Sequence, residues 1–378
     1  RARPCVMLGV YVHLPFCPYL CPYCDFAKWP VRASASRRYL EALGAEIDGE
    51  DSQTAATIYL GGGTPNAYDA ETVVGLLARL NSKFPGARET SIELNPELVR
   101  ERDLAAYRAA GITRISIGVQ SFEADEISTL GRKHTVADVQ NVVAQARAAA
   151  LRSISLDLIF AVPGQTPASW ARTLRTAIAL DVDHISAYGL TVEEGTPYAA
   201  WRAREPSAFL DDTREAELYA LAIETLEGAG YEQYEISNFA RSGHRCAHNC
   251  NYWANGEYVG LGVGAASYRG GVRSVHTRSL DAYIAAALGG HPIPSEAERL
   301  EGRRRAGEAV MLALRTAQGV ALGEFKERYG IDVLEDYAPV VTRFARTGLL
   351  ERVGENVRLT QRGRFFANDV CGAFITFE

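Results

Sequence analysis

The sequence predicts an α/β fold: a partial, TIM-like (β/α)6 barrel followed by a smaller helical, winged-helix-like domain. Over the first two-thirds of the chain, six short runs rich in β-branched residues alternate with six longer helical patterns. Such alternation indicates a parallel sheet with helices outside, and right-handed crossovers wind that sheet into a closed or partly closed barrel. The length of 378 residues exceeds the size at which one hydrophobic core usually divides, so a second domain is expected.

The elements of the barrel follow in chain order from these patterns. Short β-branched runs favour pleated backbone, whereas longer amphipathic segments favour helix. The predicted strands are 8–14, 57–60, 90–94, 114–119, 153–160 and 184–190. The predicted helices are 36–49, 69–83, 101–110, 136–150, 167–180 and 211–230.

Two changes of pattern divide the chain into three segments. Residues 1–230 form the predicted barrel, 231–294 a connecting segment without clear helical periodicity, and 295–378 the helical domain. In the last segment, helices at 303–316, 322–329 and 333–347 precede a predicted hairpin of 349–352 and 356–360 around Gly354-Glu355. This is a winged-helix-like order. Acidic and basic residues are equal in number from 295 to 378, which favours a docking or lid module over a DNA-binding domain.

Composition excludes several classes of function. The net charge of −6 argues against a nucleic-acid binder that relies on bulk positive charge. No apolar run reaches the roughly 18–20 residues that span a bilayer, so membrane contact is expected to be peripheral at most. The opening Arg1-Ala2-Arg3-Pro4 does not match a signal peptide, and the seven cysteines are an odd number. We therefore expect a reduced, cytoplasmic protein.

Polar or glycine-rich sequence recurs where the predicted strands end. Gly61-Gly62-Gly63-Thr64-Pro65 follows the second strand, Glu93 ends the third, Gly118-Val119-Gln120-Ser121 ends the fourth, and Asp157 lies in the fifth. The carboxyl ends of barrel strands lie on one face, and that face holds the chemistry of such folds. The sequence therefore predicts a functional site on this rim.

Three cysteines lie on the loop that follows the first strand. Cys17, Cys21 and Cys24 have the spacing C-x3-C-x2-C, which suits thiolate ligation of three irons of a 4Fe–4S cluster. The fourth iron would then be open to a small molecule. The alternatives are three buried cysteines or a zinc site without its fourth ligand. Cys5 and Cys371 have no neighbours of ligand type and should be dispensable.

The motifs resemble those of the radical S-adenosylmethionine (SAM) superfamily, in its oxygen-independent coproporphyrinogen III dehydrogenase-like branch. The resemblance rests on the cysteine triplet, the glycine run and further motifs along most of the chain. These include Ser116-Ile117-Gly118-Val119-Gln120-Ser121-Phe122, Leu130-Gly131-Arg132, Asp157-Leu158-Ile159-Phe160 and Tyr234-Glu235-Ile236-Ser237-Asn238-Phe239-Ala240. It implies that SAM chelates the open iron and that a reduced cluster cleaves it to methionine and a 5′-deoxyadenosyl radical. It also implies an electron donor such as flavodoxin or ferredoxin.

The resemblance also implies a set of SAM-binding residues. Gly62 and Gly63 let backbone approach SAM, and Thr64 offers a hydroxyl and a backbone N–H. Tyr23 would cover the adenine. The full set is Tyr11, Tyr23, Gly62, Gly63, Thr64, Glu93, Gln120, Arg132 and Asp157.

Each of these residues also has a purely structural interpretation. The glycines suit a tight turn, and Glu93 suits a solvated strand end. Arg132 and Asp157 suit an ion pair across the rim, and both tyrosines suit core packing.

A second dense group of histidine and cysteine is Cys246-Ala247-His248-Asn249-Cys250-Asn251-Tyr252-Trp253. It resembles the haem-binding motif of a haem-chaperone subfamily within the same branch, which implies His248 as a haem ligand. The alternative is a structural histidine that is hydrogen-bonded to a neighbouring loop. Cys250 departs from the subfamily, in which this position is commonly aliphatic. It is either a second ligand or a small buried residue, and burial is the favoured interpretation. The glycine run that starts at Gly260 suits either a flat ligand or a packed loop.

Three functions therefore compete. They are a chaperone that binds a cluster, SAM and haem and delivers haem to acceptor proteins, a coproporphyrinogen III dehydrogenase, and a radical SAM methyltransferase. Phe26 stands where the dehydrogenase has a further cysteine, and only ten residues precede Tyr11, where the dehydrogenase has an arm that covers its substrate. Both departures favour the chaperone. SAM cleavage is expected, whereas dehydrogenase activity is not.

Overall fold

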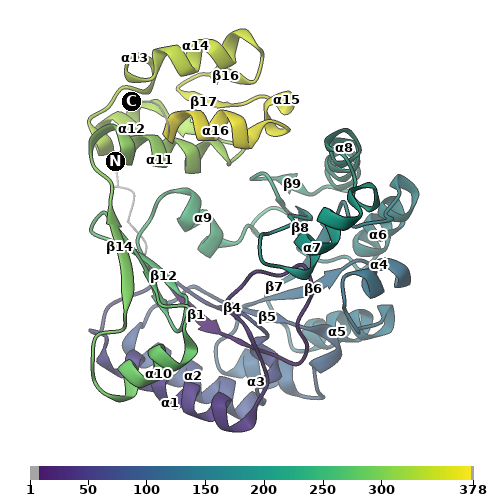
Figure 1. The fold of residues 1–378 in the computed structure, drawn as a ribbon, viewed down its shortest axis with the longest axis vertical. Coiled ribbons are helices and arrows are strands. Elements are labelled where there is room, and N and C mark those ends of the chain that lie inside the picture. Colours follow the sequence, from purple (N-terminus) through teal and green to yellow (C-terminus); the bar gives the residue numbers. More distant parts are fainter. Residues whose placement is uncertain (1–7, 376–378) are drawn as a thin grey trace.

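The computed structural model describes residues 8–375, and the six predicted strands run parallel to one another within its main sheet (Figure 1). Neighbouring strands in the sheet also follow one another along the chain, as the βα alternation predicts. They are β1 (Gly9–Leu14), β4 (Thr57–Gly62), β5 (Glu89–Leu94), β6 (Arg114–Gln120), β7 (Ser153–Phe160) and β8 (His184–Gly189). The predicted α/β fold is confirmed.

Helices follow these strands and cover the outside of the sheet (Figure 1). The six that were predicted are α1 (Ala33–Gly49), α2 (Ala70–Lys83), α3 (Asp103–Ala109), α5 (Val136–Ala148), α6 (Pro167–Ala179) and α8 (Asp212–Gly228). Local sequence sets where several begin. Thr135 and Asp138 form a reciprocal capping box at α5, and Thr166 and Ser169 form one at α6. Short helices α4 (Ala124–Thr129) and α7 (Pro197–Arg204) lie in the loops at the carboxyl ends of the strands.

The sheet does not close into a full barrel, because other strands extend both of its edges. β11 runs parallel to β1, and β10 runs antiparallel to β8. The added strands are β9 (Glu232–Gln233), β10 (Asn238–Ala240), β11 (Tyr258–Leu261), β12 (Ala266–Arg269), β13 (Val272–His276) and β14 (Ser295–Arg299). The segment 231–294 thus contributes strands, together with α9 (Ala247–Trp253) and α10 (Leu280–Leu288). The division of the chain at 230 and 294 stays a prediction.

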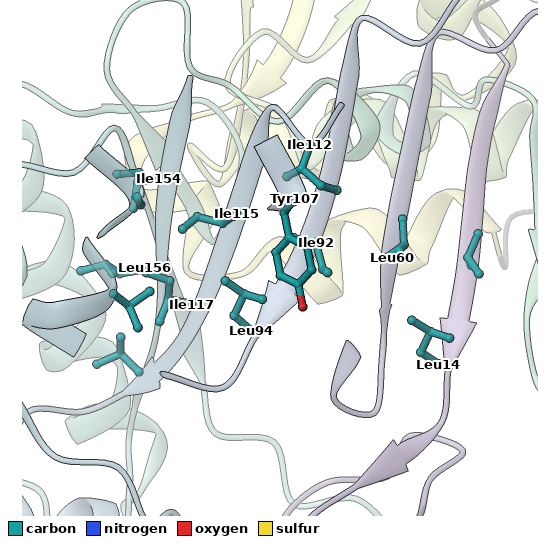
Figure 2. Packing of buried hydrophobic residues seen from close by; sticks show 14 of the residues in the cluster. Leu14, Leu60, Ile92, Leu94, Tyr107, Ile112, Ile115, Ile117, Ile154 and Leu156 are labelled. Atoms are coloured by element: carbon teal, nitrogen blue, oxygen red, sulfur yellow. The ribbon is translucent and has the colours of Figure 1, made fainter. Parts of the chain in front are cut away.

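Alternation along the strands separates an apolar face from a polar one. Leu60, Ile92, Leu94, Ile115 and Ile117 point to the side that packs against the helices, and all are almost completely buried (Figure 2). The residues between them point the other way, because side chains alternate across a strand. In many barrels that inner face is filled by branched apolar residues. Here it is largely polar, which leaves room for a site.

The C-terminal elements form a separate hydrophobic core (Figure 1). They are β15 (Val320–Ala321), α11 (Gly302–Leu314), α12 (Leu322–Tyr329), α13 (Val333–Asp336), α14 (Ala338–Arg346), β16 (Leu350–Val353), β17 (Asn356–Leu359), α15 (Gln361–Arg364) and α16 (Ala367–Ile375). The predicted order of helices and hairpin is present. The single helix predicted over 333–347 is interrupted at Tyr337, because Pro339 lacks the N–H that would bond to the Glu335 carbonyl and its ring would clash with that carbonyl.

Helix α9 lies between the barrel and the C-terminal domain (Figure 1). Arg328 of α12 donates to the carbonyls of Ala254 and Asn255 at 2.8 and 2.6 Å, directly after α9 ends. The Arg315 guanidinium lies over the Trp253 ring, 5.2 Å from its centre. The C-terminal domain therefore holds the end of α9. Among residues 8–375, no helix combines the length and apolarity needed to cross a bilayer.

Candidate functional site

A cavity of about 590 Å³ opens at the carboxyl ends of the parallel strands. Its wall contains the three cysteines of the predicted cluster loop and polar side chains of the inner face of the sheet. Of the predicted site residues, the lining includes Cys17, Cys21, Tyr23, Cys24, Gly62, Gly63, Thr64, Glu93, Gln120, Arg132 and Asp157. Residues that are widely separated in sequence thus meet in one place. Tyr11 and His248 are the two predicted site residues outside this lining.

Short backbone pairing closes the cysteine loop at its base. β2 (Phe16–Cys17) pairs with β3 (Trp29–Pro30), and the N–H of Val31 donates to the Cys17 carbonyl at 3.0 Å. Cys17 is buried, while Cys21 and Cys24 are half-buried. In residues 8–375 no three histidine, cysteine or acidic side chains come together closely enough for one metal ion. Three thiolates that each bind a different iron of a cluster do not have to converge on one point.

The remaining cysteines lie elsewhere or outside the description. Cys371 is buried in the C-terminal core, and Cys5 lies outside the described residues. Cys246 contributes to the wall of the cavity, whereas Cys250 does not.

Positive charge lies beside the cysteine loop. The Arg132 Nη1 is 4.0 Å from the Cys21 sulfur, and its Nη2 donates to Asn95 Oδ1 at 2.9 Å and to the Gly118 carbonyl at 2.7 Å. Lys28 donates to the Cys24 carbonyl. The described ion pairs do not include the proposed Arg132–Asp157 bridge. Arg132 therefore faces the cysteine loop and not Asp157.

The glycine run is shaped by close packing against the first strand. Gly62 has a φ of +109°, and a Cβ there would lie 2.4 Å from the His13 ring. A Cβ on Gly63 would lie 2.6 Å from the Pro15 carbonyl carbon. Only glycine fits at either position.

The backbone N–H groups of this run are already hydrogen-bonded. Gly62 donates to Glu93 Oε2 at 3.1 Å, Gly63 to the Leu14 carbonyl at 2.9 Å and Thr64 to the Phe16 carbonyl at 3.1 Å. The expectation that the Thr64 N–H is available to a ligand is therefore not met. The Thr64 hydroxyl stays a candidate contact.

Two buried carboxyl groups face the cavity from neighbouring parts of the sheet. Glu93 accepts from the Tyr59 hydroxyl at 2.9 Å. Asp157 accepts from the Ser116 hydroxyl at 2.8 and 2.9 Å and from the Ser186 hydroxyl at 2.8 Å. Burial raises the pKa of both groups, that of Glu93 to about 7, where the charge of Asp157 adds to the effect. These carboxyls can accept hydrogen bonds from, or attract, a polar cationic ligand.

Glu93→Gln is expected to change how stability depends on pH. The raised pKa means that folded protein holds this proton between about pH 4.5 and 7, whereas unfolded protein releases it. The contribution of the Glu93 carboxyl to the free energy of unfolding is therefore fully present at low pH and is lost as the pH rises to about 7. Glutamine does not titrate. In thermal unfolding without cofactors, the Tm of the variant minus that of the wild type should increase by about a few degrees between pH 5 and pH 8. An unchanged Tm difference would refute the assigned pKa.

The other predicted contacts occupy different depths. Gln120 has a φ of +63°, a positive value that is unusual for a residue other than glycine. It lies beside an irregularity in the pairing of β6 with β7. Tyr23 lines the cavity and packs edge-on against Tyr198. Tyr11 is not part of the lining; its hydroxyl is 3.0 Å from His13 Nδ1, and its ring stacks on Tyr59. A role for Tyr11 in SAM binding stays a prediction.

Several wall residues were not identified from the sequence. They are Tyr59, Asn95, Arg114, Ser116, His184, Ser186 and Tyr188. The register of the sheet places two of these residues, both serines, beside the predicted carboxylates, and the sequence alone does not give that register. Ser116 pairs with Glu93, and Ser186 pairs with Asp157, so each faces the same side as a predicted carboxylate.

His248 lies at the opposite end of the strands from the cysteine loop. Its Nδ1 is 2.8 Å from the hydroxyl of Thr57, the first residue of β4, and its Nε2 is 2.8 Å from the Tyr252 hydroxyl. The ring stacks on Tyr59, and burial lowers the pKa of His248 to about 3. In this conformation both ring nitrogens are hydrogen-bonded, as in the structural alternative.

The glycine run after α9 is a tightly packed loop. A Cβ on Gly260 would lie 2.0 Å from the Ala266 carbonyl oxygen, and one on Gly262 would lie 2.4 Å from the Tyr39 hydroxyl. The surrounding protein thus occupies the space beside both glycines. This favours the packed-loop interpretation over contact with a flat ligand.

Comparison with families and structures agrees with this geometry. The family model "Radical SAM superfamily" matches residues 11–177, and the model "HemN C-terminal domain" matches residues 300–366. The solved structure of the coproporphyrinogen III oxidase HemN from Escherichia coli superposes with a TM-score of 0.85 at 24% identity. It covers 98% of this chain and 91% of that one, so the two share a fold.

Curated relatives are similar over nearly the whole length. "Heme chaperone HemW" of Bacillus subtilis (strain 168) is 34% identical, over 98% of this chain and 99% of that protein. The protein of the same name from Mycobacterium tuberculosis (strain ATCC 25618 / H37Rv) is 36% identical, over 96% and 93%. That from Escherichia coli (strain K12) is 30% identical, over 97% and 98%.

Proposed function

The chain belongs to the HemW family of radical SAM proteins, and from this we propose that it is a haem chaperone that carries a 4Fe–4S cluster and SAM and delivers haem to acceptor proteins. One observation carries the proposal. Curated haem chaperones align with the barrel, with α9 and with the C-terminal domain together, over 96–98% of the chain. A shared barrel alone would not support it, because one fold hosts many functions.

Cys17, Cys21 and Cys24 would hold the cluster. The three cysteines suit a 4Fe–4S cluster because they line the same cavity. Arg132 lies beside them, and its charge offsets that of the thiolates. A bound cluster supplies an electron that cleaves the sulfonium of SAM, and the protein positions and shields both groups. A small acidic electron carrier such as flavodoxin or ferredoxin is the proposed source of that electron.

SAM would lie against the inner face of the sheet. Glu93 and Asp157 provide acceptors, Gln120 and the Thr64 hydroxyl provide further polar contacts, and Tyr23 provides an aromatic surface. The free thiols among the described residues suit a reducing compartment, and we propose the cytoplasm.

We propose His248 as the ligand of the haem iron. The neutral ring suits ligation, since burial keeps the pKa of His248 near 3. One ring nitrogen must first give up its hydrogen bond to Thr57 or Tyr252. Ligation through Nε2 would require the Tyr252 side chain to turn away, and ligation through Nδ1 would require His248 to separate from Thr57 of β4.

Anaerobic haem titration tests this function. The wild type is expected to bind haem, and His248→Ala should bind it about 5- to 150-fold more weakly, for a net loss of about 1–3 kcal/mol. Tyr252→Phe is the matched control. It frees Nε2 and keeps the ligand, so its haem affinity should equal or exceed that of the wild type.

Two results would contradict the proposal. Equal weakening in both variants would mean that His248 acts through the packing of α9. Stoichiometric conversion of coproporphyrinogen III to protoporphyrinogen IX by wild type with SAM and reductant would replace the chaperone with the dehydrogenase. Phe26, which is exposed at the cavity wall, offers no thiol at the position of the further cysteine.

A further inference from the structure

A second cavity, of about 290 Å³, lies where the parallel strands begin, at the opposite end of the sheet from the cysteine loop. Residues at the starts of β4, β5, β6 and β7 and the loop before α9 form its wall. The lining is Ala56, Thr57, Arg88, Glu89, Thr113, Arg114, Arg152, Ser153, Gly243, His244, Arg245 and Ala247. Four arginines thus converge from four separate segments of the chain.

The charge of this cavity is not balanced by its own wall. Glu89 is the single carboxylate in the lining, and it accepts from the N–H groups of Ala247 and His248, each at 3.1 Å. Arg114 is only 3% exposed and donates to the neutral Ser153 hydroxyl and to the His244 carbonyl, at 2.9 and 3.0 Å.

The other three arginines of the wall, Arg88, Arg152 and Arg245, are exposed. Arg245 pairs with Glu232, an exposed residue outside the lining, and Arg152 reaches the wall from the start of β7. An exposed pair of this kind is weak and exchanges readily. The wall therefore presents an excess of positive charge to whatever enters the cavity.

The basic cavity adjoins the proposed haem ligand. Ala247 and Thr57 belong to its wall. His248 is the next residue after Ala247, and its Nδ1 lies 2.8 Å from the Thr57 hydroxyl. An iron ligand and a basic pocket thus share one side of α9. A haem carries two carboxylates at one edge of a flat apolar ring.

We propose that this cavity binds the propionate carboxylates of haem while His248 ligates the iron. Arginine suits that task, because its planar fork can bind a carboxylate through two parallel hydrogen bonds. The cavity has room for carboxylate groups, and the ring would lie outside it along α9. The inference rests on the proposed function and specifies how the cargo is oriented.

The test compares haem with haem dimethyl ester, which lacks free carboxylates, in equilibrium titrations of the full-length protein. Arg152→Gln combined with Arg245→Gln removes two charges from the exposed part of the wall. Arg175→Gln, an exposed arginine of α6 outside the lining, is the matched control. Iron content after reconstitution and Tm show whether each variant folds.

The double variant should bind haem about tenfold more weakly than wild type or control. The dimethyl ester should bind wild type and double variant equally, with an affinity near that of haem for the double variant. Unchanged haem affinity in the double variant, with haem bound by wild type, would overturn the inference and leave the proposed function intact. Equal weakening for haem and ester would also overturn it. Absence of haem binding by wild type would overturn the proposed function itself.

Discussion

Protein in which Cys17, Cys21 and Cys24 are all replaced by alanine is expected to retain no iron after anaerobic reconstitution. The three thiols line one cavity on a loop whose base is closed by β2 and β3, so the chain presents them together. Each is expected to bind one iron, and removal of all three leaves no protein ligand. Iron and acid-labile sulfide assays and the visible absorption of the cluster measure the loss.

The matched control removes thiols that lie elsewhere. Cys250→Ala combined with Cys371→Ala should retain about four irons per chain, because neither residue contributes to the cavity wall. Four irons retained by the triple variant would refute the assignment. Circular dichroism of all three proteins distinguishes loss of ligands from loss of fold.

Asp157→Ala is expected to weaken SAM binding about 10- to 100-fold in protein that keeps its cluster. Asp157 accepts hydrogen bonds from Ser116 and Ser186 on the cavity wall, and its charge attracts a sulfonium or ammonium group. The substitution removes both effects and leaves two serine hydroxyls without their acceptor, a loss of about 1–3 kcal/mol. Equilibrium binding of SAM to the reconstituted protein, normalised to iron content, measures the change.

Asp157→Asn separates charge from hydrogen bonding. The amide oxygen can still accept from one serine, so this variant should fall between wild type and Asp157→Ala. The assignment would be wrong if Asp157→Ala lost its cluster and kept full affinity for SAM. Asp157→Asn that bound SAM as weakly as Asp157→Ala, with both clusters intact, would assign the whole effect to the charge of Asp157.

The placement of the two carboxylates was accessible to sequence analysis because it depends on short-range patterns. Glu93 and Asp157 each stand between apolar residues in a strand, and alternation turns them away from the helix-covered face. The neighbours of these carboxylates depend on register. Ser116 and Ser186 come from adjacent strands, 23 and 29 residues away along the chain, so only the paired sheet brings them to the same carboxylates.

The edges of the sheet were harder to predict than its centre. The central strands are buried and strongly apolar on one face, which produces a clear pattern. β14 is exposed along its length and β13 is mostly half-buried, so neither strand has the buried apolar face that produces a clear alternating pattern. A segment such as 231–294 therefore looks irregular in sequence, although its strands pair in the same sheet.

By itself, the sequence determined the βα order of the barrel and the placement of three thiols on one loop, because both depend on residues that are close along the chain. Only the tertiary structure decided the state of His248, whose ring is hydrogen-bonded to Thr57, 191 residues earlier. It likewise decided that Arg132 faces Cys21 and not Asp157, and that Arg114 joins the basic cavity beside α9. Such contacts depend on how distant strands and loops are registered and packed, and no local spacing encodes that arrangement.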